Sequence, residues 1–154
     1  MTKSQNRLIT TVSWIAVAAC MATIFFFSSQ AASDSQSMSD KFAFLIDFTE
    51  NAKSIIRKIA HFLEFAALGA LLSNAFYFTF RKHRPLVSFI CGFIYAASDE
   101  LHQLFVEGRA CRIFDVFIDS LGVISGIAFF TLLLFIFTRF TDPQSVTRRN
   151  SHDK

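Results

Sequence analysis

Residues 113–137 read IFDVFIDSLGVISGIAFFTLLLFIF, a stretch that is apolar over most of its length. A helix needs roughly 20 such residues to cross the hydrocarbon of a bilayer. Three further apolar stretches, at 8–27, 55–80 and 85–105, approach or exceed that length. Backbone groups in lipid must be satisfied internally, and the alternating segments of about 10 residues that build a barrel are absent from the sequence. The sequence therefore predicts an all-α membrane bundle of about four transmembrane helices.

The composition supports this class. Hydrophobic residues make up 53% of the 154 residues, and phenylalanine occurs 21 times. One core of a soluble domain this small would not hide so many phenylalanines, which leaves a soluble helical bundle as the minor alternative. The cysteines Cys20, Cys91 and Cys111 have no paired spacing, which argues against a disulfide framework or a cysteine-based zinc site. The sequence contains no recognisable nucleic-acid module, so no nucleic-acid partner is expected.

The first apolar stretch has two interpretations. Lys3 and Arg7 precede it, as they would in a secretory signal peptide. However, the apolar run is longer than the usual core of about 7–15 residues, and no A-x-A cleavage site follows it. We therefore expect an uncleaved membrane anchor, with a cleaved signal peptide as the alternative.

A polar, serine-rich connection at 28–54 joins the first two apolar stretches. Two structures fit the apolar residues within it: a short helix lying on the membrane surface, or a loop packed on the bundle. These apolar residues recur at helical spacing and are Met38, Phe42, Leu45 and Ile46.

Lysine and arginine in short connections set the orientation of a membrane protein. With the N-terminus in the cytoplasm, most of the fifteen Lys and Arg residues lie on the cytoplasmic side, and all but two of the twelve acidic residues lie towards the outside. We expect a multi-pass protein of the cell membrane with both termini in the cytoplasm. Its expected parts are an N-terminus at 1–7, a transmembrane domain at 8–138 and a polar tail at 139–154.

Three of the predicted helices carry an ionisable residue at a similar depth. With a rise of about 1.5 Å per residue, His61, Asp99 and Asp119 each lie roughly 9 Å below the outer boundary. A charge inside the bilayer costs at least about 2.5–3.5 kcal/mol, so these residues are expected to face the bundle interior or a wet cavity. Glu64 lies somewhat deeper, and Lys58, Gln103 and Asp115 lie nearer the surface.

Helical spacing places these residues on defined faces. Asp115, Asp119, Gly122 and Gly126 form one stripe, whose two glycines permit the close approach of another helix. One face of the predicted helix at 85–105 contains Gly92, Tyr95, Asp99 and Gln103. The predicted helix at 55–80 has three polar residues spaced three positions apart, Lys58, His61 and Glu64.

Four segments resemble motifs of the VanZ-like family. KIAHFLEF at 58–65 resembles K-x-x-H-F-x-E-F, and DELHQLF at 99–105 resembles D-E-x-x-Q-x-F. Residues 109–126 are similar to R-x(5)-D-V-x-x-D-x-x-G-x-x-x-G, and FSSQ at 27–30 matches a recurrent F-S-S-Q. The chain departs from the family at Val106-Glu107-Gly108, which stands where a Pro-Gly turn before the Arg is common.

The resemblance implies a small bacterial membrane protein with four or five helices. The namesake of the family is linked to low-level resistance to the glycopeptide teicoplanin, which makes the cell envelope the expected place of action. The resemblance implies no particular reaction.

The converging polar residues form a candidate site. Histidine with carboxylates supplies general acid–base groups, and basic residues at the rim would hold a phosphate or carboxylate. These residue types also suit a metal, but the H-x-x-E spacing of His61 and Glu64 is not a specific metal signature, so no metal is assigned. The pattern also does not indicate a particular cofactor. The catalytic candidates are His61, Glu64, Asp99 and Asp119, and the candidates for ligand binding are Lys58, Glu100, Gln103, Arg109 and Asp115.

Two of these residues also have structural interpretations. His61 would hydrogen-bond Asp99 and thereby lock two helices together. Glu100 lies about one helical step of 100° from Asp99, so it would face another neighbour and pair with Arg109 or Arg112.

Three functions fit the candidate site. The favoured one is an outward-facing polar pocket that binds or modulates a lipid-linked or cell-wall ligand. The alternative is an intramembrane hydrolase or transferase acting on an envelope lipid, with His61 as base, Asp99 or Asp119 orienting it, and Lys58 with Arg109 holding an anion. A proton-coupled transporter is less favoured, because the cytoplasmic halves of the predicted helices have almost no polar residues.

Overall fold

The computed structural model describes residues 2–30, 50–106 and 113–141. Every regular element in these ranges is a helix, which confirms the predicted all-α fold. The proposed surface helix at 38–46 and the candidate residue Arg109 lie outside the described residues. The helices are α1 (Lys3–Ser28), α3 (Glu50–Phe80), α4 (Pro85–Gln103) and α5 (Ile113–Thr141).

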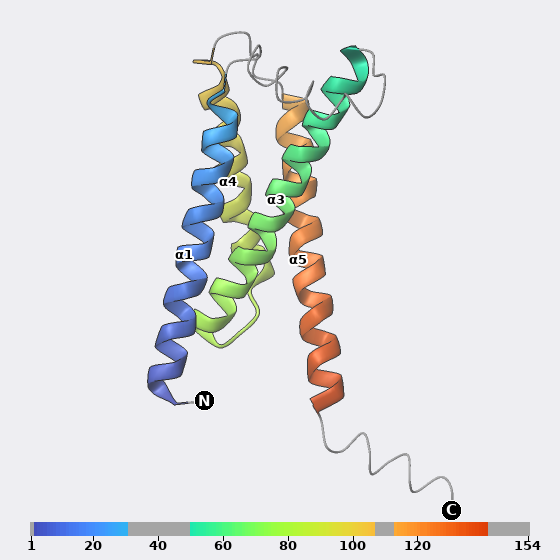
Figure 1. Cartoon of the computed structure of the whole chain (residues 1–154). Coiled ribbons are helices and arrows are strands. Elements are labelled where there is room, and N and C mark those ends of the chain that lie inside the picture. Colours follow the sequence, from blue (N-terminus) through green and yellow to red (C-terminus); the bar gives the residue numbers. More distant parts are fainter. Residues whose placement is uncertain (1, 31–49, 107–112, 142–154) are drawn as a thin grey trace, which may run out of the picture.

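The described helices stand side by side along one direction (Figure 1). α1 and α4 run up in that view, while α3 and α5 run down, so α3 and α5 are parallel neighbours. α3 contacts α1, α4 and α5 and is the central helix of the bundle. The upper end of the bundle therefore collects the ends of α1 and α4 and the starts of α3 and α5.

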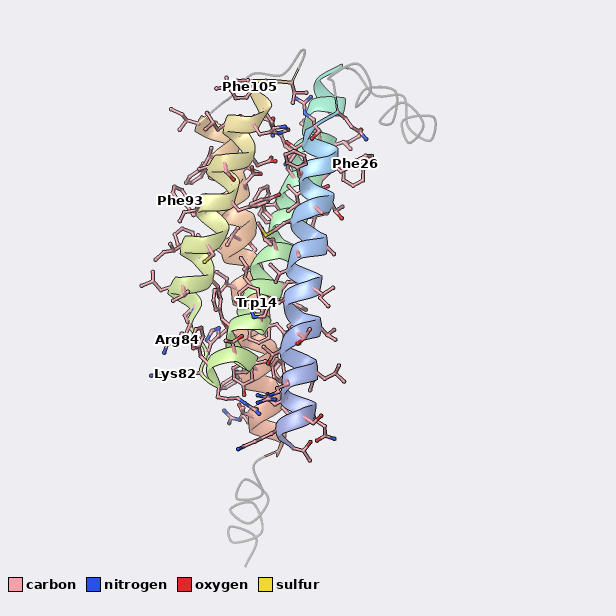
Figure 2. All side chains as sticks on the ribbon, turned by 90° about the vertical axis from the view of Figure 1, so that its left-hand side faces the viewer. Trp14, Phe26, Lys82, Arg84, Phe93 and Phe105 are labelled. Atoms are coloured by element: carbon pink, nitrogen blue, oxygen red, sulfur yellow. The ribbon has the colours of Figure 1, made fainter. Side chains whose placement is uncertain are left out.

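Among the described helices, two are long and apolar enough to cross a membrane, Lys3–Ser28 and the part Ile113–Arg139 of α5. Figure 2 shows large side chains such as Phe26 and Phe93 pointing away from the bundle, and 62% of Phe26 is exposed. Outward-facing apolar side chains of this size are expected where lipid, rather than water, surrounds a helix.

Local sequence explains where the helices begin and turn. Thr2 and Gln5 form a capping box at the start of α1, in which each side chain accepts a hydrogen bond from the other residue's backbone N–H. α3 ends at Phe80, and Arg81 then takes a left-handed conformation with a φ of 54°, which reverses the chain. Pro85 opens α4 at a position where its missing N–H costs no helical hydrogen bond.

Glycines set the close packing of α3 against α5. A Cβ on Gly122 would lie 2.5 Å from the backbone oxygen of Phe62, and one on Gly126 would collide with the backbone oxygen of Ala66. Gly69 on α3 approaches the backbone of α5 in the same way. The predicted close approach at the two glycines of α5 is therefore confirmed, and the small residues let the backbones touch.

An apolar core fills the bundle beside this interface. It is built around α3, with contributions from the three helices that pack on it. Fully or nearly fully buried members are Val17 and Ile24 on α1, Phe65, Leu68, Leu72, Ala75 and Phe76 on α3, Ala96 on α4, and Val123 and Ile127 on α5.

The lower half of the bundle contains more buried polar groups than the sequence suggested. Asn74 Nδ2 on α3 donates a 2.9 Å hydrogen bond to the buried Ser13 Oγ on α1, and at the exposed surface Trp14 Nε1 donates a 3.0 Å bond to Thr79 Oγ1. Ser73 is fully buried as well. The expectation that these halves hold almost no polar residues is wrong, because hydroxyl and amide side chains pair across the α1–α3 interface. These groups are neither acids nor bases.

Candidate functional site

A partly exposed ion pair between α3 and α5 stands at the upper end of the bundle. Lys58 Nζ lies 3.4 Å from Asp115 Oδ1, and the two side chains are 31% and 27% exposed. Lys58 Nζ also lies 5.1 Å from the centre of the Phe114 ring, close enough for a cation–π contact. Lys58 and Asp115, called here the rim pair, are the part of the site that water and ligands reach most easily.

One helical turn deeper, the same two helices bring His61 to Asp119. His61 Nδ1 lies 4.0 Å from Asp119 Oδ1, and the side chains are 14% and 3% exposed. Because α3 and α5 run parallel, steps of three and four residues carry both helices from the rim pair to this pair in register. One more turn leads to the Gly122 contact, so the stripe predicted on α5 faces α3 throughout.

Asp99 on α4 supplies a further buried acid and is 3% exposed. Its Oδ2 atom accepts hydrogen bonds from Ser28 Oγ at 2.9 Å and from Gln103 Nε2 at 3.1 Å. Its Oδ1 atom is buried and accepts no hydrogen bond from any residue in the described ranges. The carboxylate is therefore satisfied on one oxygen and open on the other.

Two further predicted residues lie at the same end. Glu100 is buried, with 1% of its surface exposed, and Glu64 is partly buried. Burial of Glu100 beside Asp99 shows that both carboxylates of the Asp-Glu motif turn into the bundle. The proposed partners of Glu100, Arg109 and Arg112, lie outside the residues that the structure describes.

The structure thus brings most of the predicted residues to the same end of the bundle. His61 faces Asp119 across α3 and α5, and Asp99 accepts hydrogen bonds from Ser28 on α1 and from Gln103 on its own helix. We call the assembled group the polar cluster, and its members are Ser28, Lys58, His61, Asp99, Gln103, Asp115 and Asp119.

Ser28 is the member that sequence reasoning missed. It is the last residue of α1, is fully buried, and spans 71 positions of sequence to reach Asp99. The signal was present in the F-S-S-Q match at 27–30, but no pattern within α1 tells which helix its end will touch.

The chemistry available to the polar cluster is acid–base chemistry and the binding of polar groups. Among the described residues, no three His, Cys, Asp or Glu side chains are placed to hold a metal ion together. An imidazole beside a carboxylate suits proton transfer, and the buried carboxylates suit the binding of cations and hydrogen-bond donors.

Comparisons with known proteins agree with the motif resemblance. A family model described as VanZ/LLP1 matches residues 13–151. No curated protein and no solved structure gives a match. The family match includes the end of α1 and the whole of α3, α4 and α5, from which every member of the polar cluster comes. The protein is therefore a membrane protein that belongs to the VanZ-like family.

Proposed function

We propose that this protein crosses the membrane four times and binds or modulates a component of the bacterial cell envelope through its polar cluster. In this proposal, residues 8–138 form the transmembrane domain, and both termini, including the tail at 139–154, lie in the cytoplasm. The polar cluster then faces the outer side of the membrane, where a lipid-linked or cell-wall ligand is accessible.

The distribution of basic residues supports this orientation. Arg81, Lys82 and Arg84 are exposed in the turn between α3 and α4, and Figure 2 shows Lys82 and Arg84 at the lower end of the bundle. Lys and Arg in short connections favour the cytoplasmic side. The end that carries the polar cluster would therefore lie outside.

The single observation that carries the binding function is the ladder of polar pairs on α3 and α5. It begins at the partly exposed rim pair and continues to His61, which is mostly covered, and to the buried Asp119. Burial of ionisable groups inside a membrane bundle costs free energy, and such groups are functional candidates by default. A ladder that reaches the surface offers a ligand a polar route from water into the bundle.

Family membership points to a class of ligand. The namesake of the VanZ-like family is linked to teicoplanin, a glycopeptide that acts at the cell envelope. We therefore propose a glycopeptide-resistance type of role, in which the bound envelope component changes the response of the cell to such drugs.

The experiment expresses the wild-type chain and the variants His61→Ala, Asp99→Asn and Asp119→Asn in a glycopeptide-susceptible bacterium. Membrane levels are matched, and teicoplanin susceptibility is scored together with the lipid profile of the envelope. Ser98→Ala and Ser125→Ala are matched controls, because both serines are exposed and bond backbone oxygens of their own helices. The proposal expects tolerance from the wild type and both controls, and its loss in each cluster variant. Full tolerance in all three cluster variants would contradict it.

A second function is favoured by the contact between His61 and Asp119. A carboxylate beside Nδ1 can orient an imidazole that acts as a base through its other nitrogen. The protein would then be a hydrolase or transferase acting on an envelope lipid. Accumulation of one defined lipid precursor in all three cluster variants would favour this enzyme, whereas lost tolerance with an unchanged lipid profile would favour binding.

A further inference from the structure

Asp99 has an acceptor that the bundle leaves open. The residue is 3% exposed, and both Ser28 and Gln103 donate to Oδ2, while Oδ1 receives no hydrogen bond from the residues described. Most buried polar atoms in folded proteins have a partner, and a buried one without a partner requires an explanation. A missing ligand group is such an explanation.

The charge of the neighbouring groups indicates what the missing group is. The pairs that join α3 to α5, Lys58 with Asp115 and His61 with Asp119, do not include Asp99. The two donors to Asp99 are a hydroxyl and an amide, both neutral. Because a carboxylate oxygen accepts hydrogen bonds, the group that completes the site must bring an N–H or O–H, and a positive charge would be favoured.

The geometry selects among cations. A guanidinium binds a carboxylate best with two parallel hydrogen bonds, one to each oxygen. Oδ2 of Asp99 is already occupied by two donors, so the open oxygen suits a donor that makes a single contact. An ammonium group is a compact point charge with rotatable N–H donors and fits this requirement. No three metal-binding side chains gather in the described part of the chain, which makes a metal a poorer candidate.

We propose that Asp99 binds a protonated primary amine of the envelope ligand. This inference rests on the proposed binding function and names the group that is bound. The amine belongs either to the headgroup of an aminophospholipid or to a soluble molecule. The rim pair lies at the partly exposed end of the same cluster, where Lys58 offers a positive charge to an anionic group on the same ligand.

The experiment uses the full-length protein in nanodiscs of phosphatidylglycerol that contain equal amounts of phosphatidylethanolamine and phosphatidylcholine. Lipids retained on the protein after release into the gas phase are identified by native mass spectrometry. The two added lipids differ in the amine, since the trimethylated headgroup of phosphatidylcholine has no N–H to donate. We expect wild-type protein to retain phosphatidylethanolamine in preference to phosphatidylcholine. A second arm adds ethanolamine or ethylamine to the solution, and displacement of the lipid would show that soluble amines share the site.

The variant Asp99→Asn keeps the shape and one acceptor of the side chain but removes its charge. It is expected to lower the preference for phosphatidylethanolamine by about tenfold, the loss typical of a hydrogen bond to a charged group. Ser98→Ala, at the neighbouring exposed position, is the control and should keep the preference. In the soluble arm, ethylamine binding measured by saturation-transfer NMR in phosphatidylglycerol nanodiscs should fall in the same variant.

The outcomes separate this inference from the proposed function. Equal retention of the two lipids by wild-type protein, together with no ethylamine binding, would overturn the amine proposal without any use of variants. An unchanged preference in folded Asp99→Asn would overturn it as well. If amine binding fails but Asp99→Asn still loses glycopeptide tolerance, the envelope-binding function survives with another ligand group. If amine binding is found but tolerance is unaffected, the ligand group is correct and the proposed role is wrong.

Discussion

Ser28, the last residue of α1, donates a 2.9 Å hydrogen bond to Asp99 Oδ2 inside the bundle. Ser28 is fully buried and Asp99 is 3% exposed, so the bond is shielded from water. It joins the first helix to α4, although α1 and α4 make few other contacts. The end of α1 thus helps to fix the acid on which the amine proposal depends.

The variant Ser28→Ala removes this donor. A hydrogen bond to a charged group contributes about 1.5–3 kcal/mol, so unfolding should become easier by about that amount. Thermal unfolding in detergent measures the change. Ser29→Ala is the matched control, because Ser29 is exposed and bonds the backbone oxygen of Phe25 on its own helix. Equal stability of Ser28→Ala and Ser29→Ala would show that the bond to Asp99 contributes nothing.

The variant Gly126→Ala tests the contact between α3 and α5. Its Cβ would collide with the backbone oxygen of Ala66, which cannot rotate away as a side chain would. Overpacking of this kind costs about 1–3 kcal/mol and would also move Asp119 relative to His61. We expect a lower unfolding temperature and reduced tolerance to teicoplanin. Ser125→Ala, on the exposed side of the same turn, should leave both readouts unchanged, and a neutral Gly126→Ala would contradict the packing described.

The pair Ser13 and Asn74 tests the polar interface of α1 and α3. Hydrogen bonds between membrane helices contribute about 0.6 kcal/mol on average and up to about 2 kcal/mol. A double-mutant cycle of Ser13→Ala and Asn74→Ala, read by thermal unfolding, should give a coupling free energy in this range. The control cycle pairs Thr23→Ala with Asn74→Ala, because Thr23 is exposed and bonds its own helix. Coupling as small as in the control would mean that the bond adds no stability.

The variant Lys58→Gln separates function from stability at the rim pair. Partly exposed ion pairs contribute about 0–1 kcal/mol, so the unfolding temperature should change little. Teicoplanin tolerance should nevertheless fall, because Lys58 is the partly exposed cation of the polar cluster. Lys82→Gln, at the other end of the bundle, is the matched control and should behave like wild type. Unchanged tolerance in Lys58→Gln would remove the rim pair from the binding site.

The proposed orientation is tested by single cysteines in a chain whose three native cysteines are replaced by alanine. Phe105→Cys lies at the upper end, where Phe105 is 84% exposed, and Lys82→Cys lies at the lower end (Figure 2). A maleimide that does not cross membranes should label Phe105→Cys on intact cells. It should label Lys82→Cys after the cells are opened. The reverse pattern would place the polar cluster in the cytoplasm.

Much of this fold follows from the sequence. The apolar stretches predicted helices, and the helices occur, because a chain in lipid must satisfy its backbone hydrogen bonds internally. Their observed ends differ from the predicted spans by a few residues, since capping at Thr2 extends α1 and α5 continues to Thr141. The stripe on α5 was also predictable, because helical periodicity fixes which residues of one helix share a face.

By itself, then, the sequence determined the helices and the face of its helix on which each polar residue lies. The tertiary structure decided which faces meet: that His61 lies opposite Asp119, that Ser28 reaches Asp99, and that one oxygen of Asp99 stays open. Periodicity describes the direction of a side chain around its own helix axis. The partner across the interface depends on the order, rotation and separation of the packed helices, and these are set jointly by contacts such as those at Gly122 and Gly126.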